Sequence, residues 1–381
     1  MLNRIEISKS ALIHNVELFK KIAGNAKIGL VLKSNAYGHG LKEIYQILSE
    51  AQEKKLLADC YLITNYFCEA KELRDLGYAG KLLIVGPVPT NDLEKYYQDS
   101  AKEKIELTIS CKESLAAWLT CSVKPDIHIK FDTGMSRQGF FTDEAAKIAT
   151  KIVPFKSNVI GVCTHFANVE DVLEHDYADQ QLIKFDCAYK AFKDKGLHVM
   201  RHTASSASCL ILEKSRFDLC RIGISLYGMW PSKATRLSFL QTFNQVAELQ
   251  PVLSWKTNVM TVKTVKSGQF IGYGCTVRAV QDMKIAVIPV GYFEGFPRIA
   301  SDARSYVLMN GSRCPIVGRV CMNMMMADVS HLSSANVGDL VTLIGTDGNE
   351  SISANDLAGW AQTINYELLS RLNPSIPRTL V

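Results

Sequence analysis

Short apolar, β-rich runs recur at fairly even spacing along the first two thirds of the chain, and amphipathic stretches separate them. Apolar residues at helical spacing fill intervals such as 41–52 (LKEIYQILSEAQ) and 143–153 (DEAAKIATKIV). Parallel strands need such helical crossovers, so eight runs within about 235 residues predict an α/β fold, a (β/α)8 barrel of the TIM type. A doubly wound open sheet is the alternative. The runs are residues 26–33, 60–64, 81–86, 105–110, 126–133, 158–166, 198–206 and 218–228.

After Gly228 the pattern changes, because strand-like runs continue with few helical stretches between them. These runs are residues 252–265, 283–292, 305–320 and 339–346. The pair Asn310-Gly311 lies between apolar runs and predicts a tight hairpin. We therefore expect an all-β C-terminal domain, with residues 1–235 forming the barrel and residues 236–381 forming the mostly β domain.

Composition and charge exclude several classes of protein. The 381 residues are 47% hydrophobic, which is enough for a full core, and the net charge of +5 comes from 43 basic and 38 acidic residues in short mixed groups. The sequence has no stripe of basic residues of the kind that binds nucleic acid, so we expect no nucleic-acid partner. It also has no apolar run long enough for a signal peptide or a membrane span. The eleven cysteines are dispersed and form no CxxC pair, so we expect reduced thiols, no metal site and a cytoplasmic protein.

Polar residues collect at the carboxyl ends of the predicted barrel strands. They are Lys33, Lys130, Asp132, His165, Ser205, Ser206 and Arg221. In a barrel these ends meet at one mouth, where catalytic groups lie. Taken singly, each of these residues favours a structural role, His165 as a satisfied half-buried histidine and Lys130 or Arg221 as a member of an ion pair. Lys33 ends an apolar run before the turn-rich string SNAYGHG, and a desolvated amine there loses its proton easily.

Seven motifs, in order across both predicted domains, resemble those of alanine racemases, which are pyridoxal 5'-phosphate (PLP) enzymes of this two-domain plan. The string KSNAYGHG at residues 33–40 is similar to the family's cofactor-lysine motif. The others are KFDTGMSRQGF (130–140), THFA (164–167), RIGISLYG (221–228), GYGCT (272–276), PVGYFEGFPR (289–298) and GRVCMN (318–323).

The resemblance implies racemisation of alanine by two bases, with PLP as the electron sink. Lys33 would bind PLP covalently and act on one face of the α-carbon. Tyr273 of the C-terminal domain would act on the opposite face in the neighbouring subunit, which makes the protein a homodimer with shared sites. The product D-alanine would supply peptidoglycan synthesis.

The resemblance also assigns binding roles. Tyr37, Ser206 and the backbone N–H groups of Gly223 and Ile224 would hold the phosphate. Arg221 would face the pyridine nitrogen, with His165 beside it.

For the substrate, the resemblance implies that Arg137 and the backbone N–H of Met322 contact the carboxylate. Lys130 matches a lysine that is carbamylated in many members of the family, and a carbamate there would hold Arg137.

Three departures from the family pattern affect cofactor and substrate binding rather than proton transfer. Pro374 stands where many members have a phosphate-binding tyrosine, Asn323 where an aspartate is frequent, and Ser205 where asparagine is common. A racemase of broader specificity is therefore the alternative. Three other classes are weaker candidates. Arg221 argues against a PLP decarboxylase, and the β domain argues against a PLP-binding barrel without catalysis. The presence of both Lys33 and Tyr273 argues against an inactive relative.

Overall fold

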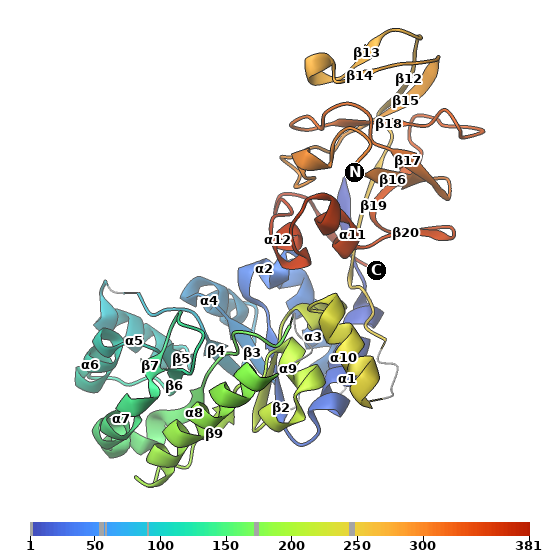
Figure 1. Ribbon diagram of the computed structural model, residues 1–381. Coiled ribbons are helices and arrows are strands. Elements are labelled where there is room, and N and C mark those ends of the chain that lie inside the picture. Colours follow the sequence, from blue (N-terminus) through green and yellow to red (C-terminus); the bar gives the residue numbers. More distant parts are fainter. Residues whose placement is uncertain (1–2, 53–56, 58, 90, 171–174, 244–247) are drawn as a thin grey trace. The chain divides into compact units, whose positions relative to one another are not determined.

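The computed structural model describes residues 3–52, 57, 59–89, 91–170, 175–243 and 248–381, and these group into two compact units (Figure 1). One unit consists of Ser10–Ser34 and Tyr45–Gln250. The other consists of Met1–Lys9, Asn35–Ile44 and Pro251–Val381. The strand at the start of the chain therefore belongs to the same unit as the C-terminal third. No helix in the described ranges has both the length and the apolar character needed to cross a bilayer.

The first unit contains the predicted barrel. All eight expected runs form parallel strands, which neighbour one another in the order β10-β2-β3-β4-β5-β6-β8-β9. The strands are β2 (Lys27–Val31), β3 (Tyr61–Thr64), β4 (Lys81–Ile84), β5 (Glu106–Ile109), β6 (Ile127–Asp132), β8 (Val159–Cys163), β9 (Met200–His202) and β10 (Leu219–Ile222).

The last strand returns to the first, which makes this sheet a nearly closed barrel. β10 pairs with β2, and the seam between β9 and β10 is joined by hydrogen bonds from Asp218 N–H to the Arg201 oxygen (3.1 Å) and from Arg221 N–H to the Ala204 oxygen (3.0 Å). An open doubly wound sheet would reverse its strand order at a switch point instead. That alternative is wrong for this chain.

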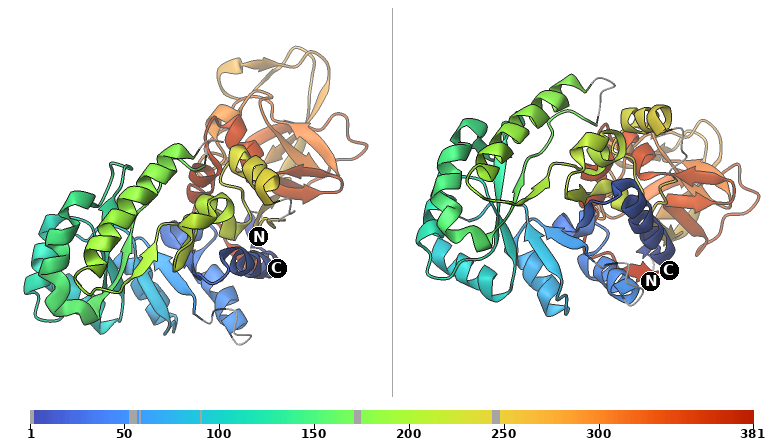
Figure 2. Two further views of the ribbon diagram at one scale, coloured as in Figure 1. Left: turned by 60° about the horizontal axis from the view of Figure 1, so that its bottom comes forward. Right: turned by 90° about the horizontal axis from the view of Figure 1, so that it is seen from below.

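Helices surround the barrel strands on the outside (Figure 2). Besides the one-turn helix α2 (Lys33–Tyr37), the described helices of this part of the chain are α1 (Lys9–Ala23), α3 (Leu41–Gln52), α4 (Phe67–Asp75), α5 (Leu93–Lys102), α6 (Lys112–Thr120), α7 (Ala145–Ile152), α8 (Asp176–Lys193), α9 (Ser206–Ile211) and α10 (Lys233–Phe243). Their inner faces bury large side chains against the strands, as where the Phe131 and Phe192 rings meet edge to face at 5.6 Å. Short turns η1 to η4 (Thr142–Glu144, Val153–Asn158, Glu213–Ser215, Ile224–Tyr227) and the short strand β7 (Phe140–Phe141) complete this part.

The second unit is built mainly from strands. One sheet has the order β17-β16-β19-β11-β1-β21, with β20 beside β19, and two smaller sheets are β12-β15-β18 and β13-β14. The strands are β1 (Arg4–Ile7), β11 (Leu253–Asn258), β12 (Thr261–Val265), β13 (Phe270–Ile271), β14 (Val277–Arg278), β15 (Met283–Ile288), β16 (Tyr306–Met309), β17 (Ser312–Pro315), β18 (Met325–Asp328), β19 (Leu340–Asp347), β20 (Glu350–Ile352) and β21 (Arg378–Leu380).

The expected mostly β domain is confirmed, with one correction of detail. The run 252–265 is two strands in different sheets, because the chain turns at Val259 and Met260. Two short helices, α11 (Ala354–Trp360) and α12 (Asn365–Ser370), follow the strands. Helix α11 begins at Ser353, whose hydroxyl accepts from the Asp356 N–H at 3.1 Å. The remaining turns are η5 (Tyr273–Cys275) and η6 (Arg298–Ala300).

Candidate active site

Lys33 lies just beyond β2 rather than on it. The strand ends at Val31, and Lys33 opens the one-turn helix α2 (Lys33–Tyr37). Four consecutive non-glycine residues there, Ser34 to Tyr37, have φ between 51° and 57°, so the turn is left-handed. That conformation costs roughly 1–2 kcal/mol per residue for L-amino acids. The turn-rich string after the strand predicted a tight loop here, but its left-handed conformation was not predicted.

Glu69, in the first turn of α4, ties down the backbone next to Lys33. Its carboxylate accepts from the Ser34 N–H at 2.5 Å and from the N–H groups of Asn65 and Tyr66 at 2.8 and 3.1 Å. Burial lowers the pKa of Lys33, and the positive charges of Arg137 and Arg221 act in the same direction while Glu69 opposes them. The amine is therefore more easily deprotonated than a free lysine.

Arg221, on β10, is held by several acceptors from two neighbouring strands. Its Nη1 donates to His202 Nδ1 at 3.0 Å and to the His202 oxygen at 2.7 Å. Its Nη2 donates to the Thr164 oxygen at 2.9 Å and the Thr203 oxygen at 3.1 Å, and lies 3.4 Å from His165 Nδ1. The structure thus brings Arg221 and His165 together. Burial, reinforced by the Arg221 charge, lowers the pKa of His165 far below its usual value, so this imidazole is neutral.

Lys130, on β6, is a further basic side chain at this end of the barrel. Its Nζ donates to Gln138 Oε1 at 3.0 Å, and Gln138 in turn donates to the Ser110 hydroxyl at 3.0 Å. Burial lowers the pKa of Lys130 to about 8, and the charges of Arg221, Arg137 and Lys33 contribute. Arg137 itself is exposed. Four basic side chains therefore influence one another here, and an anionic group would be attracted to them.

A small cradle of donors lies where β10 ends. Gly223 N–H donates to Ser206 Oγ at 2.8 Å, and Ile224 opens the turn η4 directly after it. Tyr227, in the same turn, donates its hydroxyl to the Val31 oxygen at 2.8 Å. The cradle is thereby linked to the end of β2, two residues before Lys33. Backbone N–H groups with a serine hydroxyl are the donor set that suits a phosphate.

Three predicted site residues belong to the second unit. Tyr37 is half-buried, with its ring 6.2 Å from that of Tyr366. Tyr273 begins η5 between Gly272 and Gly274, both with φ near 76°, and its side chain is 72% exposed. Met322 is also exposed, and its backbone oxygen accepts from the Phe293 N–H at 2.9 Å.

Sequence reasoning missed the polar groups inside the barrel that support Arg221. These are His202, His128 and Glu106, each at most 2% exposed. A signal was present, because β6 reads IHIKFD and alternates polar and apolar residues. Strands of a parallel barrel are buried on both faces, so a polar residue on such a strand must find a partner inside.

Comparison with known proteins gives one consistent family. The family described as "Alanine racemase, N-terminal domain" matches residues 7–231, and "Alanine racemase, C-terminal domain" matches residues 252–380.

Individual relatives agree with the family matches. An alanine racemase of Leptospira interrogans is 38% identical over 99% of this chain and 95% of its own length, and one of Methanococcus maripaludis is 33% identical over 98% and 97%. The crystal structure of alanine racemase from Bacillus anthracis with bound L-Ala-P has a TM-score of 0.87 at 31% identity, covering 100% of this chain and 95% of that one. The enzyme of D-cycloserine-producing Streptomyces lavendulae has the same TM-score at 28% identity, with coverage of 100% and 97%.

Proposed function

The chain belongs to the alanine racemase family, and from this premise we propose that it interconverts L- and D-alanine with PLP as cofactor. The observation that carries the proposal is the match to alanine racemases along both domains, together with Lys33 at the mouth of the barrel among basic side chains. The D-alanine formed would serve peptidoglycan synthesis in the cytoplasm.

The residues at the barrel mouth fit PLP. Ser206 and Ile224 can offer a hydroxyl and an amide donor to a phosphate, and the Gly223 N–H, which donates to Ser206 Oγ in this structure, would have to exchange that bond for one to the phosphate. Tyr37 is proposed as a further phosphate contact. Lys33 offers an amine with a lowered pKa for covalent attachment. When bound, PLP supplies the electron sink that makes the α-proton of an amino acid removable.

Lys33 and Tyr273 are the proposed proton carriers. Lys33 Nζ accepts a proton once it is neutral, and burial together with the charges of Arg137 and Arg221 lowers its pKa and so favours the neutral form. Tyr273 Oη is the proposed carrier on the opposite face. Its exposed side chain on a glycine-flanked turn of the second unit suits a group that serves a neighbouring subunit. We propose a homodimer in which Tyr273 of the partner subunit completes each site.

Arg221 is proposed to donate to the pyridine nitrogen. A guanidinium keeps its protons, so the nitrogen would stay unprotonated and side reactions such as transamination would be suppressed. His165 beside it is neutral and adds no competing charge. This arrangement favours racemisation over decarboxylation within PLP chemistry.

The substrate carboxylate is assigned to Arg137 and to the backbone N–H of Met322 from the partner subunit. Lys130, with a pKa of about 8, has an amine that is partly neutral at physiological pH and can form a carbamate with carbon dioxide. The carbamate would turn a cation into an anion able to hold Arg137.

The test is racemisation by the purified protein of L-alanine, L-serine and L-lysine, each followed by optical rotation with and without added PLP. The expected result is PLP-dependent loss of optical activity with alanine, at a kcat/KM well above that for the others. Comparable rates on all three would support the broader-specificity alternative. No loss of rotation with any amino acid would refute the proposed function.

A further inference from the structure

Three hydrogen bonds run in series from Arg221 to the far end of the barrel. Arg221 Nη1 lies 3.0 Å from His202 Nδ1, His202 Nε2 lies 2.9 Å from His128 Nδ1, and His128 Nε2 lies 2.8 Å from Glu106 Oε2. Glu106 is the first residue of β5, so it lies at the amino-terminal end of the strands, whereas the mouth lies at their carboxyl ends. The four residues come from β10, β9, β6 and β5 and cross the barrel interior.

The two ends determine where every proton in this series lies. A guanidinium can only donate and an ionised carboxylate can only accept. His202 Nδ1 must therefore be a bare acceptor, so its proton is on Nε2 and is donated to His128 Nδ1. By the same logic His128 carries its proton on Nε2 and donates it to Glu106. Both imidazoles are neutral Nε2–H tautomers, and each bond has one direction only.

The electrostatics agree with that assignment. Burial alone would raise the pKa of Glu106, but the hydrogen bonds from His128 and Lys81 and the positive charge of Lys81 lower it, so the carboxylate is ionised. Burial, reinforced by the positive charge of Arg221, lowers the pKa of His202 far below its usual value, which keeps this imidazole neutral.

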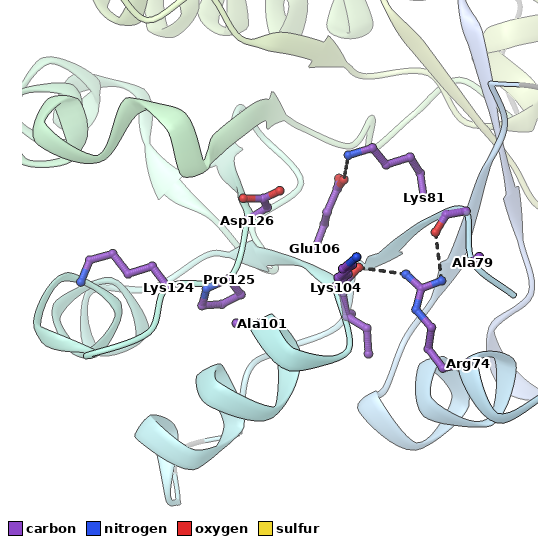
Figure 3. Close-up of a pocket in the computed structure, with 11 residues that line it drawn as sticks. Arg74, Ala79, Lys81, Ala101, Lys104, Glu106, Lys124, Pro125 and Asp126 are labelled. Atoms are coloured by element: carbon purple, nitrogen blue, oxygen red, sulfur yellow. Dashed lines mark hydrogen bonds and ion pairs between the residues drawn. The ribbon is translucent and has the colours of Figure 1, made fainter. Parts of the chain in front are cut away.

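The outer end of the series borders a pocket of about 370 Å³ (Figure 3). Glu106 is only 2% exposed, and its Oε1 accepts from the exposed Lys81 at 2.9 Å in the pocket wall. Asp126, another carboxylate of the same pocket, accepts from Asn158 at 3.2 Å instead. The pocket is therefore lined by one carboxylate that belongs to the series of hydrogen bonds, Glu106, and one that does not, Asp126.

Gly161 leaves the space that the His128 ring occupies. His128 pairs in register with Gly161 on β8, and a Cβ on Gly161 would lie 2.3 Å from His128 Nδ1, the atom that accepts from His202. Any other residue at position 161 would displace the ring. The local backbone thus accommodates the His128 to His202 bond specifically.

We infer that Glu106 is a positioning residue for Arg221: it sets the tautomers of His128 and His202 so that a lone pair on His202 faces the guanidinium. The Glu106 carboxylate is also the negative charge at the end of this series of hydrogen bonds, opposite the positive charge of Arg221. The role in catalysis rests on the proposed function, because it is Arg221 that would face the pyridine nitrogen. The tautomer assignment does not depend on it.

The experiment compares Glu106→Gln and Glu106→Leu with Asp126→Asn as the matched control. The glutamine side chain has nearly the volume of glutamate, but its amide can donate to His128 and so permits the reverse direction of the series. The leucine side chain removes the acceptor altogether. Long-range proton–nitrogen NMR of full-length protein labelled with ¹⁵N-histidine reports the protonated ring nitrogen, and absorbance titration reports the PLP dissociation constant.

In the unsubstituted protein and in Asp126→Asn, His128 and His202 are expected as Nε2–H tautomers. In Glu106→Leu nothing accepts from His128 Nε2, so an Nδ1–H tautomer of His128 should appear, which reverses its bond to His202 and moves the His202 proton to Nδ1 at the cost of the ring bond from Arg221. The signals of both histidines should therefore show a tautomer mixture, and PLP should bind on the order of tenfold more weakly, as when one hydrogen bond to a charged group is lost. Glu106→Gln should give an intermediate mixture of tautomers.

Pure Nε2–H tautomers and unchanged PLP affinity in both Glu106 variants would overturn the inference. So would an Nδ1–H tautomer of either histidine in the unsubstituted protein. If that protein binds no PLP yet has the expected tautomers, which Glu106→Leu disturbs, the hydrogen-bond series is supported and the proposed function fails. The two failures are thereby distinguished.

Discussion

His202 accepts from Arg221 twice, through its ring Nδ1 at 3.0 Å and through its backbone oxygen at 2.7 Å. A guanidinium held by both atoms of one residue cannot rotate without losing two bonds. The direction in which Arg221 points is therefore set by β9, the neighbouring strand, rather than by its own rotamer preference. Since β9 and β10 meet at the closing seam of the barrel, barrel closure itself orients this arginine.

Replacing Lys33 by alanine should abolish racemisation, with a fall of at least roughly a thousandfold, because the variant loses both the cofactor attachment and one proton carrier. The purified variant should also retain no PLP after borohydride treatment and denaturation. Lys27→Ala, which removes an exposed lysine at the start of β2, the strand that precedes Lys33, is the control and should keep both properties. Covalent PLP in Lys33→Ala would contradict the assignment.

Replacing Tyr273 by phenylalanine should affect the two enantiomers unequally. Loss of one general acid–base group costs about 10²–10⁴ in the step it serves, so α-deuterium uptake from D₂O should fall far more for one enantiomer of alanine than for the other. Mass spectrometry of recovered L- and D-alanine measures this. Tyr306→Phe, whose ring packs at 4.7 Å on Trp360, should leave both rates unchanged. Equal losses for both enantiomers in Tyr273→Phe would rule out two bases.

Carbamate formation on Lys130 should increase with pH. With a pKa of about 8, the neutral amine rises from about 10% of the population at pH 7 to about 90% at pH 9, and only the neutral form reacts with carbon dioxide. Protein equilibrated with ¹³C-bicarbonate should therefore show a carbamate carbon signal that grows over this range. Lys130→Met should lack the signal. A signal that persists in the variant would place the carbamate elsewhere.

His39 should make the protein less stable in mild acid. Its ring is fully buried, and burial lowers its pKa to about 4, although bonds to the Tyr37 and Ala36 oxygens oppose the shift. The unfolded chain takes up this proton below about pH 6.5 and the folded chain only near pH 4, so stability falls as the pH drops through that window.

The loss attributable to this group is roughly 3 kcal/mol at most between pH 6.5 and pH 4. Urea unfolding at several pH values measures it, and His39→Gln should give a shallower pH dependence. The exposed His198 provides the control variant His198→Gln, which should follow the unsubstituted protein. An unchanged slope in His39→Gln would mean that other groups carry the acid sensitivity.

Gly38, directly after the left-handed turn, should not tolerate alanine. Its φ is +83°, and a Cβ there would lie 1.9 Å from the Leu369 oxygen, so the backbone must move. We expect a loss of more than about 2 kcal/mol in the free energy of unfolding. Gly24 also has positive φ (+64°) but open space around its Cβ position, so Gly24→Ala should cost only about 1 kcal/mol. Equal losses would show that φ alone matters.

The apolar runs and the amphipathic stretches between them predicted eight strands with helical crossovers, and so a barrel, with a doubly wound open sheet as the alternative. Buried strands of a parallel barrel are short apolar runs, and in the helices between them apolar residues recur about every 3.6 positions. Each element can therefore be predicted from its own stretch of sequence. The change of pattern after Gly228 similarly predicted the β domain, and the polar residues at strand ends identified Lys33, His165 and Arg221 as a group.

Tertiary structure decided what local patterns cannot encode. The partners of Arg221 depend on which strands become neighbours when the barrel closes, so Glu106, His128 and His202 come together only in the folded chain. The left-handed turn after Lys33 goes against the intrinsic preference of its four residues, and distant groups such as Glu69 stabilise it. Likewise, β1 pairs with β11 and β21, which lie more than 200 residues further along the chain, so this pairing cannot be predicted from local sequence.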